Sequence, residues 1–392
     1  MKIFFIVLCC LTLSNCRSSS SSDKYPEIVT YPFCSTISSL SDIIQSIEVI
    51  PLTKQNDFIL GFMPRILHRD SCFYIGDPGH SKLIYRFRQD GHFLNTIGAF
   101  GKGPGEYLSL SDFYVDETTD DIYTLSYPDL RLYRFDKEGN FKGMKTQKYN
   151  PGSFLLKNDT FWVYGGNNNG YMPEQLIRCD TNLNIIDKLC PLDTKTIHIS
   201  LGPVFSQWKD QAFLIMGFDP QVYRLGQDTL LPLIRFDFGK CNISASYWES
   251  KDPLQAVMDL QNKGFCNLNN FMVNDEYFIS EQNEQRGSNH MQTWYVCAVK
   301  HRISGKWDWI RKEISGGGLV VDDQINEPSE VQPEWYMGKI HGFTKDGRLM
   351  ILPDGMSLES MPAADKALIS NPQALNPIDP ETTTVLFLCT LK

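Results

Sequence analysis

Short runs in which apolar and polar positions alternate recur along this chain, and most end at a glycine or a polar turn. Two of the clearest, residues 83–87 and 93–97, are joined by the turn Asp90-Gly91. Runs of this length with a turn between them predict antiparallel β-strands. A second hairpin over residues 132–141 repeats the motifs Tyr-Arg-Phe and Gly-x-Phe, both 48 residues after their first copies. One offset shared by two motifs indicates a structural repeat.

The repeat continues through weaker copies. Arg178 lies 44 residues after Arg134, and Arg224 lies a further 46 residues along the chain. A period of about 40–50 residues with four strands in each repeat is typical of the blades of a β-propeller. We therefore predict an all-β fold, a six-bladed β-propeller built from four-stranded antiparallel blades.

The two ends of the repeat region complement each other. The sixth blade, with apolar runs at 340–343, 348–352 and 384–389, lacks a fourth strand, whereas the apolar segment 43–52 precedes the first blade and has no blade of its own. We expect segment 43–52 to complete the sixth blade and close the ring, because closure removes exposed sheet edges.

Two insertions between strands predict short helices. The first spans 253–263, with Asp252 as the N-cap, Pro253 at the first helical position and Gly264 as the terminating residue. These residue types are favoured at those positions of a helix. The second insertion spans 360–369 and interrupts the sixth blade.

The N-terminus has the pattern of an export signal. Lys2 is followed by an apolar run over residues 3–13, which is too short to cross a bilayer core of about 30 Å. The run ends in Leu13-Ser14-Asn15-Cys16, which resembles the lipobox of bacterial lipoproteins, although Asn15 replaces the usual small residue. Cys16 is therefore the predicted lipidation site; the alternative is an ordinary signal peptide with Cys16 as an incidental thiol.

A polar, serine-rich stretch follows Cys16, and such stretches form flexible tethers. We predict a signal peptide over 1–15, a tether over 16–41 and the propeller over 42–392. Residue 17 is Arg, so the Asp that retains enterobacterial lipoproteins in the inner membrane is absent. An outer-membrane lipoprotein facing the periplasm or the cell surface is the predicted localisation, with the leaflet left open.

The net charge and the cysteine content of the chain argue against two kinds of binding, that of nucleic acid and that of zinc. The net charge is −9 and no cluster of Lys and Arg stands out, which argues against nucleic-acid binding. After Cys16 the chain has eight cysteines, an even number that permits disulfides in an exported protein. Their spacing contains no Cys-x-x-Cys pair, which argues against a zinc site built on cysteine, and several lie in apolar runs, where a buried thiol is the favoured interpretation.

Two motifs that suggest chemistry have structural explanations. The run 101–105, Gly-Lys-Gly-Pro-Gly, lacks the Gly-Lys-Ser/Thr ending of a phosphate-binding loop, and we interpret it as a connection between blades. His68, His80 and His92 are spaced by 12 residues, but the blade pattern assigns them to an inner strand and two different turns. They are therefore not expected to bind one metal ion.

Four polar residues fall nearest the inner strands that would line the central channel: Arg65, Asp112, Gln207 and His341. Their side chains are chemically mismatched as a set of metal ligands. We predict no metal, no cofactor and no catalytic residue, and keep these four as candidate channel-lining residues.

The lipobox-like sequence, the segment 47–52, the Tyr85-Arg86-Phe87 hairpin and the run 101–107 together resemble the six-bladed β-propeller lipoproteins of Bacteroidetes, which are related to NHL-repeat propellers. The resemblance covers about residues 42–392, with its specific motifs in the first two blades. It implies a fold and an envelope location but no catalytic residue. NHL-type propellers include metal-assisted lyases and lactonases whose ligands come from several blades.

Two functions therefore remain open. The favoured one is a monomeric, lipid-tethered binding or scaffold module for a glycan, peptide or protein, with no enzymatic activity. The alternative is an NHL-type hydrolase or lyase that acts on a carbohydrate or lactone-like substrate.

Overall fold

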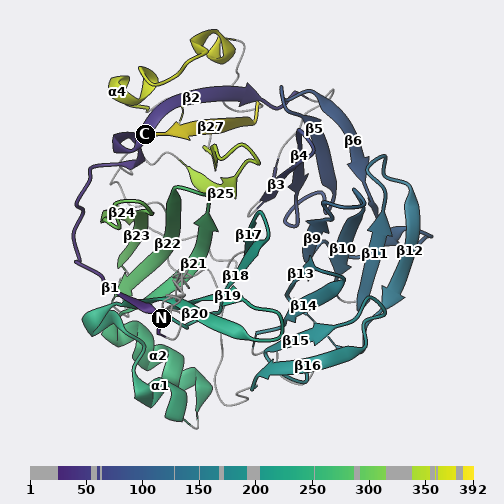
Figure 1. Cartoon of the computed structure of the whole chain (residues 1–392), viewed down its shortest axis with the longest axis horizontal. Coiled ribbons are helices and arrows are strands. Elements are labelled where there is room, and N and C mark those ends of the chain that lie inside the picture. The colour runs from purple at the N-terminus through teal and green to yellow at the C-terminus, as the bar shows by residue number, and fades with distance from the viewer. Residues whose placement is uncertain are drawn as a thin grey trace, which may run out of the picture.

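Six β-sheets surround a common axis in the computed structural model of the chain (Figure 1). The structure describes residues 25–53, 60–61, 64–127, 129–149, 151–166, 172–191, 204–250, 252–286, 292–314, 338–353, 358, 361–376 and 383–392. Each sheet is a blade with four antiparallel strands, and one blade carries an additional strand. The predicted six-bladed β-propeller is confirmed.

The first three blades follow one another in sequence, and each runs from its innermost to its outermost strand. Blade 1 contains β3 (Arg65–Arg69), β4 (Cys72–Gly76), β5 (Ile84–Arg88) and β6 (Phe93–Ile97). Blade 2 contains β9 (Asp112–Val115), β10 (Ile122–Ser126), β11 (Arg131–Phe135) and β12 (Phe141–Thr146). Blade 3 contains β13 (Ser153–Lys157), β14 (Thr160–Tyr164), β15 (Leu176–Cys179) and β16 (Ile185–Cys190).

The last three blades include the longest strands, those of blade 5, and the insertions. Blade 4 contains β17 (Phe205–Trp208), β18 (Gln211–Ile215), β19 (Gln221–Leu225) and β20 (Leu230–Asp237). Blade 5 contains β21 (Phe265–Val273), β22 (Tyr277–Arg286), β23 (Gln292–His301) and β24 (Trp307–Ile314). Blade 6 contains β25 (Lys339–Phe343), β26 (Leu349–Leu352), β27 (Val385–Leu391) and, as its outermost strand, β2 (Ile44–Pro51).

Strand β2 closes the ring as the sequence predicts. It pairs antiparallel with β27, from Ile44 opposite Leu391 to Pro51 opposite Val385. Ile47 and Val49 are buried in the core of this blade. The two ends of the propeller are thus joined by a strand-to-strand ladder, so neither end of the ring is left as an open sheet edge.

The segment before β2 also packs on the propeller. Residues Glu27–Thr30, which the sequence analysis assigns to the tether, form β1, which pairs in parallel with β20 as the fifth strand of blade 4. Further along, the backbone N–H of Thr36 donates to the carbonyl of Trp309 in β24 at 2.8 Å. The chain therefore crosses the outer edges of blades 4 and 5 before it enters blade 6.

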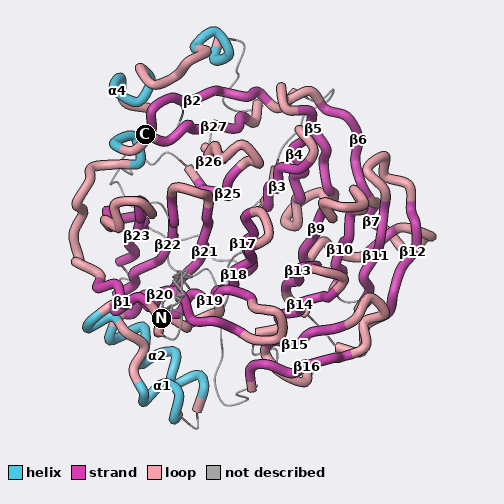
Figure 2. The backbone as a smooth tube through the Cα atoms, viewed as in Figure 1, coloured by secondary structure: helices cyan, strands magenta, loops and turns pink. Residues whose placement is uncertain are grey.

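The predicted helices lie outside the ring, where Figure 2 draws them in cyan. Helix α2 (Pro253–Lys263) follows the short helix α1 (Ala245–Glu249) in the connection between blades 4 and 5. The Asp252 carboxylate accepts the backbone N–H of Gln255 at 3.1 Å, and Gly264, with φ of +83°, ends the helix. Helix α4 (Ala363–Lys366) lies in the second insertion.

Minor elements complete the chain. They are the 3₁₀ turns η2 (Leu40–Asp42), η3 (Gly239–Cys241) and η4 (Pro372–Leu375), together with the parallel two-stranded pair β7 (Ala99–Phe100) and β8 (Glu106–Tyr107). The glycine-rich run 101–105 joins β7 to β8 on the way from blade 1 to blade 2, which is the connection between blades that the sequence predicts. The Glu106 carboxylate accepts the Gly103 N–H at 2.7 Å in this loop.

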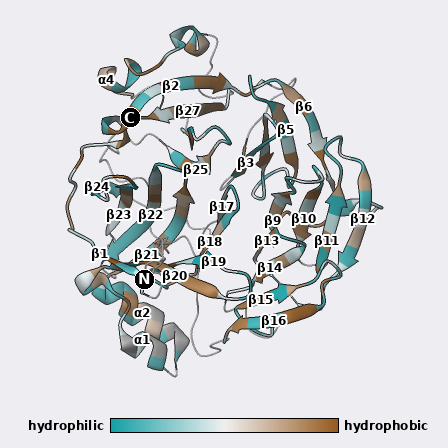
Figure 3. Ribbon diagram, in the orientation of Figure 1, coloured by the Kyte–Doolittle hydropathy of each residue, from teal (hydrophilic) through white to brown (hydrophobic). Residues whose placement is uncertain are grey.

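The core consists of apolar side chains packed between neighbouring blades, and Figure 3 shows hydrophobic residues gathered in the strands and hydrophilic residues in many of the loops. Large aromatic side chains such as Phe73, Phe113 and Trp162 are almost completely buried there. The eight cysteines after Cys16 are all free thiols, and Cys34 is exposed. Within the described ranges, no helix has the length and apolar character needed to cross a membrane.

Candidate functional site: the central channel

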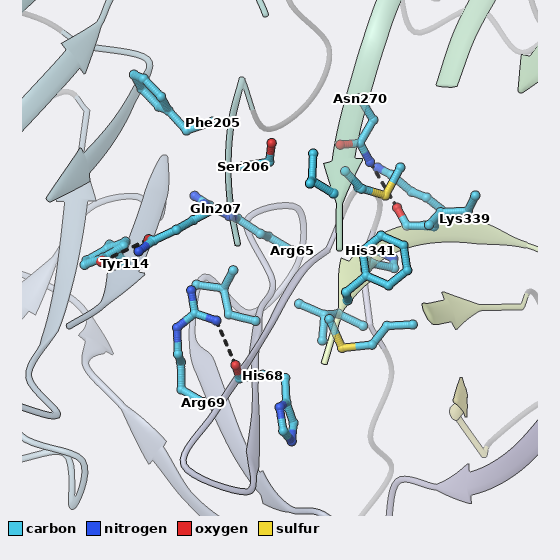
Figure 4. Close-up of a pocket in the computed structure, with 18 of the residues that line it drawn as sticks. Arg65, His68, Arg69, Tyr114, Phe205, Ser206, Gln207, Asn270, Lys339 and His341 are labelled. Atoms are coloured by element: carbon cyan, nitrogen blue, oxygen red, sulfur yellow. Dashed lines mark hydrogen bonds between the residues drawn. The ribbon is translucent and has the colours of Figure 1, made fainter. Parts of the chain in front are cut away.

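An open cavity of about 80 Å³ lies where the innermost strands of the blades meet. All six innermost strands contribute to its wall, and Figure 4 labels side chains from five of them, β3, β9, β17, β21 and β25, around a shared space. The polar residues of the wall are Arg65, His68, Arg69, Tyr114, Ser206, Gln207, Asn270, Lys339 and His341. The remaining wall is largely apolar and includes Leu155, Phe205, Met272, Phe343 and Met350.

The structure brings three of the four candidate channel residues together. Arg65 on β3, Gln207 on β17 and His341 on β25 line the cavity. Asp112 is on the innermost strand β9 but is not part of the cavity wall. The predicted lipidation site, Cys16, lies outside the described residues.

Asp112 connects three blades. Its carboxylate forms an ion pair with the Arg65 guanidinium of blade 1. The same carboxylate accepts the Ser153 hydroxyl at 2.6 Å and the backbone N–H of Phe154 at 3.1 Å, both from blade 3. Asp112 is 7 % exposed. A buried carboxylate with this many partners is stabilised in its charged form, so its role is to hold blades 1, 2 and 3 together.

The cavity wall is cationic, although the chain as a whole is acidic. It contains Arg65, Arg69 and Lys339 and no Asp or Glu. Carboxylates behind the wall neutralise two of these cations, since Asp112 pairs with Arg65 and Glu117 pairs with Arg69 at 3.1 Å. Burial lowers the pKa of Arg65 to about 10, which leaves it charged at neutral pH.

Lys339 is the third cation. Among the described residues, no carboxylate lies within ion-pair distance of its ammonium group. Burial lowers the pKa of Lys339, and the attraction of Glu281 acts in the opposite direction. Glu281 is itself held by other groups, because it accepts the Asn270 amide at 3.0 Å and the Tyr295 hydroxyl at 2.9 Å.

Two histidines add neutral polar atoms to the wall. Burial lowers the pKa of His68 to about 4, and burial together with the nearby Lys339 lowers the pKa of His341 to about 3. Both imidazoles are therefore neutral at pH 7. The Nδ1 atom of His68 accepts the backbone N–H of Lys345 at 3.1 Å, whereas the Nε2 atoms of both rings are buried without a hydrogen-bond partner among the described residues.

A β-bulge places His341. The pairing of β25 with β26 shifts between Ile340 and Gly342, so His341 is the extra residue of the bulge. Gly342 has φ of +114°, a value that side-chain-bearing residues rarely adopt. The Asn270 amide donates to the carbonyl of Ile340 at 3.2 Å and fixes the bulge from the neighbouring blade. Bulges of this kind re-aim side chains and are common next to functional sites.

Strand β21, which carries Asn270, has a bulge of its own between Leu268 and Asn270. The innermost strand pairs of blades 1 to 4 run without such a shift. The irregular backbone of the innermost strands is thus confined to blades 5 and 6, on the side of the cavity that carries Lys339 and His341.

Blades 2 and 4 supply neutral hydrogen-bonding groups. The Tyr114 hydroxyl donates to Gln207 Oε1 at 3.3 Å. Burial raises the pKa of Tyr114 to about 12, so this hydroxyl stays protonated. Tyr114 therefore acts in the wall as a hydrogen-bond donor.

The histidines at 12-residue spacing do not converge, in agreement with the blade pattern. His68 is on β3, His80 is in the turn between β4 and β5, and His92 is in the turn between β5 and β6. In the described part of the chain, no group of three or more His, Cys, Asp and Glu side chains has the arrangement of a metal site.

Several wall residues were not among the sequence candidates. Arg69 lies four positions after Arg65, so alternation along β3 pointed to it. Lys339 lies on β25, where the bulge at His341 breaks the alternation. Asn270 had no such signal, because the bulge between Leu268 and Asn270 breaks the alternation along β21.

Comparison with known proteins supports the fold. The chain is similar to the crystal structure of a candidate exported protein from Bacteroides fragilis NCTC 9343, with a TM-score of 0.72, 16 % identity, and coverage of 93 % of this chain and 99 % of that one. A second structure, from a member of the DUF4221 family of Bacteroides vulgatus, matches with a TM-score of 0.49 and 10 % identity over 89 % of this chain and 98 % of the other. At 16 % identity the likeness to the Bacteroides fragilis protein shows the fold alone.

No curated protein sequence matches the chain. A family model does match, over residues 34–341, and its description is "Domain of unknown function (DUF4934)". The match spans blades 1 to 5, together with β2 and the start of β25 in blade 6, which is most of the propeller. The chain therefore belongs to the DUF4934 family.

Proposed function

We propose that this protein is a binding module that takes its ligand into the central channel. The observation that carries the proposal is the cavity itself, because six strands from six blades surround one open space. Within the described ranges, its wall holds a cation without an ion pair and two buried imidazole nitrogens without a hydrogen-bond partner. Buried polar atoms are normally hydrogen-bonded, and an exception needs an explanation. A ligand that supplies the missing partners is that explanation.

The charges around the channel favour binding over turnover. General acid–base chemistry needs a group that can accept or release a proton beside the bound molecule. Asp112 and Glu117 are paired with Arg65 and Arg69 behind the wall. Glu281 accepts hydrogen bonds from Asn270 and Tyr295. His341, with its pKa lowered to about 3, remains neutral across the physiological range. The alternative of an NHL-type hydrolase or lyase has no comparable support in the described part of the chain.

The proposed location is the bacterial envelope. An apolar leader, a lipobox-like sequence ending at Cys16 and a serine-rich stretch support a lipoprotein anchored in the outer membrane. The similar fold of a candidate exported Bacteroides protein agrees with export. A monomeric propeller on such a tether would present its channel to a glycan, peptide or protein ligand in the periplasm or at the cell surface.

Binding is tested with the chain purified from membranes in detergent and applied to arrays of glycans and peptides. Ser206→Trp fills the cavity, since Ser206 belongs to its wall, and Ser304→Trp makes the same change at an exposed turn of blade 5. We expect the wild type and Ser304→Trp to bind the same array members and Ser206→Trp to lose them, with circular dichroism showing all three folded.

Binding that survives Ser206→Trp, or a wild type that binds no array member, contradicts the channel proposal. Conversion of an array member to a product, lost in Ser206→Trp, would instead establish the enzymatic alternative. The anchor is tested separately by growing cells with an alkyne fatty acid. Cys16→Ala should remove the label from the protein, and a label that persists would refute lipidation at this residue.

A further inference from the structure

We infer that the channel recognises a single carboxylate group on a small polar ligand, with the Lys339 ammonium as its ion-pair partner and the His341 imidazole as a hydrogen-bond donor. This inference rests on the proposed binding function and specifies its ligand chemistry. It comes from the charge balance of the wall, the backbone that positions the two side chains, and the size of the cavity.

The charge balance leaves one cation for the ligand. Arg65 and Arg69 each have a protein carboxylate, Asp112 and Glu117, whereas Lys339 has no carboxylate at ion-pair distance among the described residues. No Asp or Glu among the described residues lines the cavity to repel an anion. One cation without an ion pair matches one negative charge, so a carboxylate fits better than phosphate, which is partly dianionic at pH 7.

The donor set also fits a carboxylate. A neutral imidazole holds one proton, and with that proton on Nε2 the unpartnered atom of His341 is a donor. An ammonium group and an N–H together can occupy both oxygens of one carboxylate. Hydrogen bonds with an ionised partner are about twice as strong as neutral ones. The apolar neighbours Met272, Phe343 and Met350 lower the local dielectric constant and strengthen the ion pair further.

The backbone around these two residues is specifically shaped. His341 is the extra residue of the β25 bulge, which moves it out of the regular alternation that begins at Lys339. Asn270 holds the bulge through the Ile340 carbonyl, and the same amide holds Glu281. Figure 4 shows Asn270, Lys339 and His341 on one side of the cavity and Arg65 and Gln207 on the other. Preorganised donors of this kind are characteristic of small-ligand sites.

The volume limits what can enter. A cavity of about 80 Å³ is roughly half the size of one that encloses benzene, which is about 150 Å³. It has room for a carboxylate and its adjacent carbon, so the rest of the ligand must extend through the open mouth. The recognised unit is therefore the acid group itself, carried at the end or edge of a larger polar molecule.

The inference is tested by ligand-observed NMR titration of the detergent-purified chain at pH 7. The probes are acetate, D-glucuronate, D-glucose and inorganic phosphate. We expect both carboxylates to bind, glucose not to bind, and phosphate to bind more weakly than acetate. If glucuronate binds more tightly than acetate, the sugar ring contributes to the affinity. If the two affinities are equal, the protein recognises the carboxylate alone.

Two variants remove the proposed partners. Lys339→Met deletes the charge while keeping much of the side-chain volume, and it should weaken carboxylate binding by about tenfold or more. His341→Phe removes the donor and should weaken binding several-fold. Lys306→Met is the matched control, because Lys306 is 69 % exposed in a turn of blade 5 and should leave binding unchanged.

Each contrary result has a distinct meaning. Unchanged carboxylate affinity in Lys339→Met, or phosphate binding more tightly than acetate, overturns the inference. Binding of a neutral array ligand that is lost in Ser206→Trp, without any carboxylate binding, also overturns it but leaves the channel proposal intact. If neither the probes nor the array members bind, both proposals fail.

Discussion

Closure of the propeller by β2 can be tested at Ile47. This side chain is fully buried in the core of blade 6, and its backbone N–H donates to the Leu368 carbonyl at 2.8 Å. Ile47→Ala removes three carbon atoms, which costs about 2.4 kcal/mol at about 0.8 kcal/mol for each buried carbon. The cavity left behind adds to this transfer term, so we expect the free energy of unfolding to fall by about 3 kcal/mol.

The matched control is Ile28→Ala, which removes the same three carbons at a position that is 69 % exposed on β1. Its effect should stay within about 0.5 kcal/mol. The assay is urea denaturation followed by tryptophan fluorescence and far-ultraviolet circular dichroism. If Ile47→Ala lowers stability no more than Ile28→Ala does, β2 contributes little to closing the ring and the argument from burial is wrong.

Three further predictions concern the channel and the thiols. Burial lowers the pKa of His68 from its usual 6.5 to about 4, so between these pH values the unfolded chain binds more protons than the folded one. The contribution of His68 to the stability of the fold should therefore fall as the pH is lowered from about 6.5 to 4. The difference in urea midpoint between the wild type and His68→Gln should grow smaller across that window and then level off. Asp112→Asn should destabilise the protein by about 3 kcal/mol, because it leaves the Arg65 charge buried without its partner. The control Asp90→Asn changes an ion pair that is more than half exposed, so it should lower the free energy of unfolding by less than about 1 kcal/mol in the same denaturation assay. N-ethylmaleimide applied to the native protein should modify the exposed Cys34 before the other described cysteines, and peptide mass spectrometry that finds a buried thiol labelled first would contradict the structure.

Much of the propeller architecture could be predicted from local patterns in the sequence. The shared offset of the Tyr-Arg-Phe and Gly-x-Phe motifs gave the blade period, and the unpaired apolar strand at 43–52 gave the closure. Both are encoded in short stretches of sequence, because strand alternation and turn residues act over a few positions. The same holds for helix α2, whose ends are set by Asp252 and Gly264.

The path of residues 27–37 across blades 4 and 5 could not be predicted from local sequence patterns. Only Val29 of the four residues in β1 is buried, so the strand has no strong apolar pattern. It is held by pairing with β20, about 200 residues away in sequence, and by bonds such as that from Thr36 to Trp309. Contacts of this kind depend on the assembled fold and leave no local periodicity to read.

The channel was predictable only as far as alternation holds. Arg65 and Gln207 lie on regular inner strands, and the period of two places them correctly in the cavity wall. In β21 and β25 a bulge adds one residue and changes which side chains face the axis. The sequence alone does not reveal these bulges, so the importance of Asn270 and Lys339 became apparent only from the structure.

The chemistry of the channel follows from how the blades are joined. Asp112 holds blades 1, 2 and 3 together, and by pairing with Arg65 it also removes one positive charge from the ligand's side of the wall. Lys339 forms no ion pair with a described carboxylate, and Glu281, which attracts it at longer range, accepts hydrogen bonds from Asn270 and Tyr295. Lys339 also shares a sheet with β2, the strand that closes the ring. The blade that depends most on long-range closure is therefore the blade that carries the proposed ligand contacts, so damage to β2 should weaken both the fold and the site.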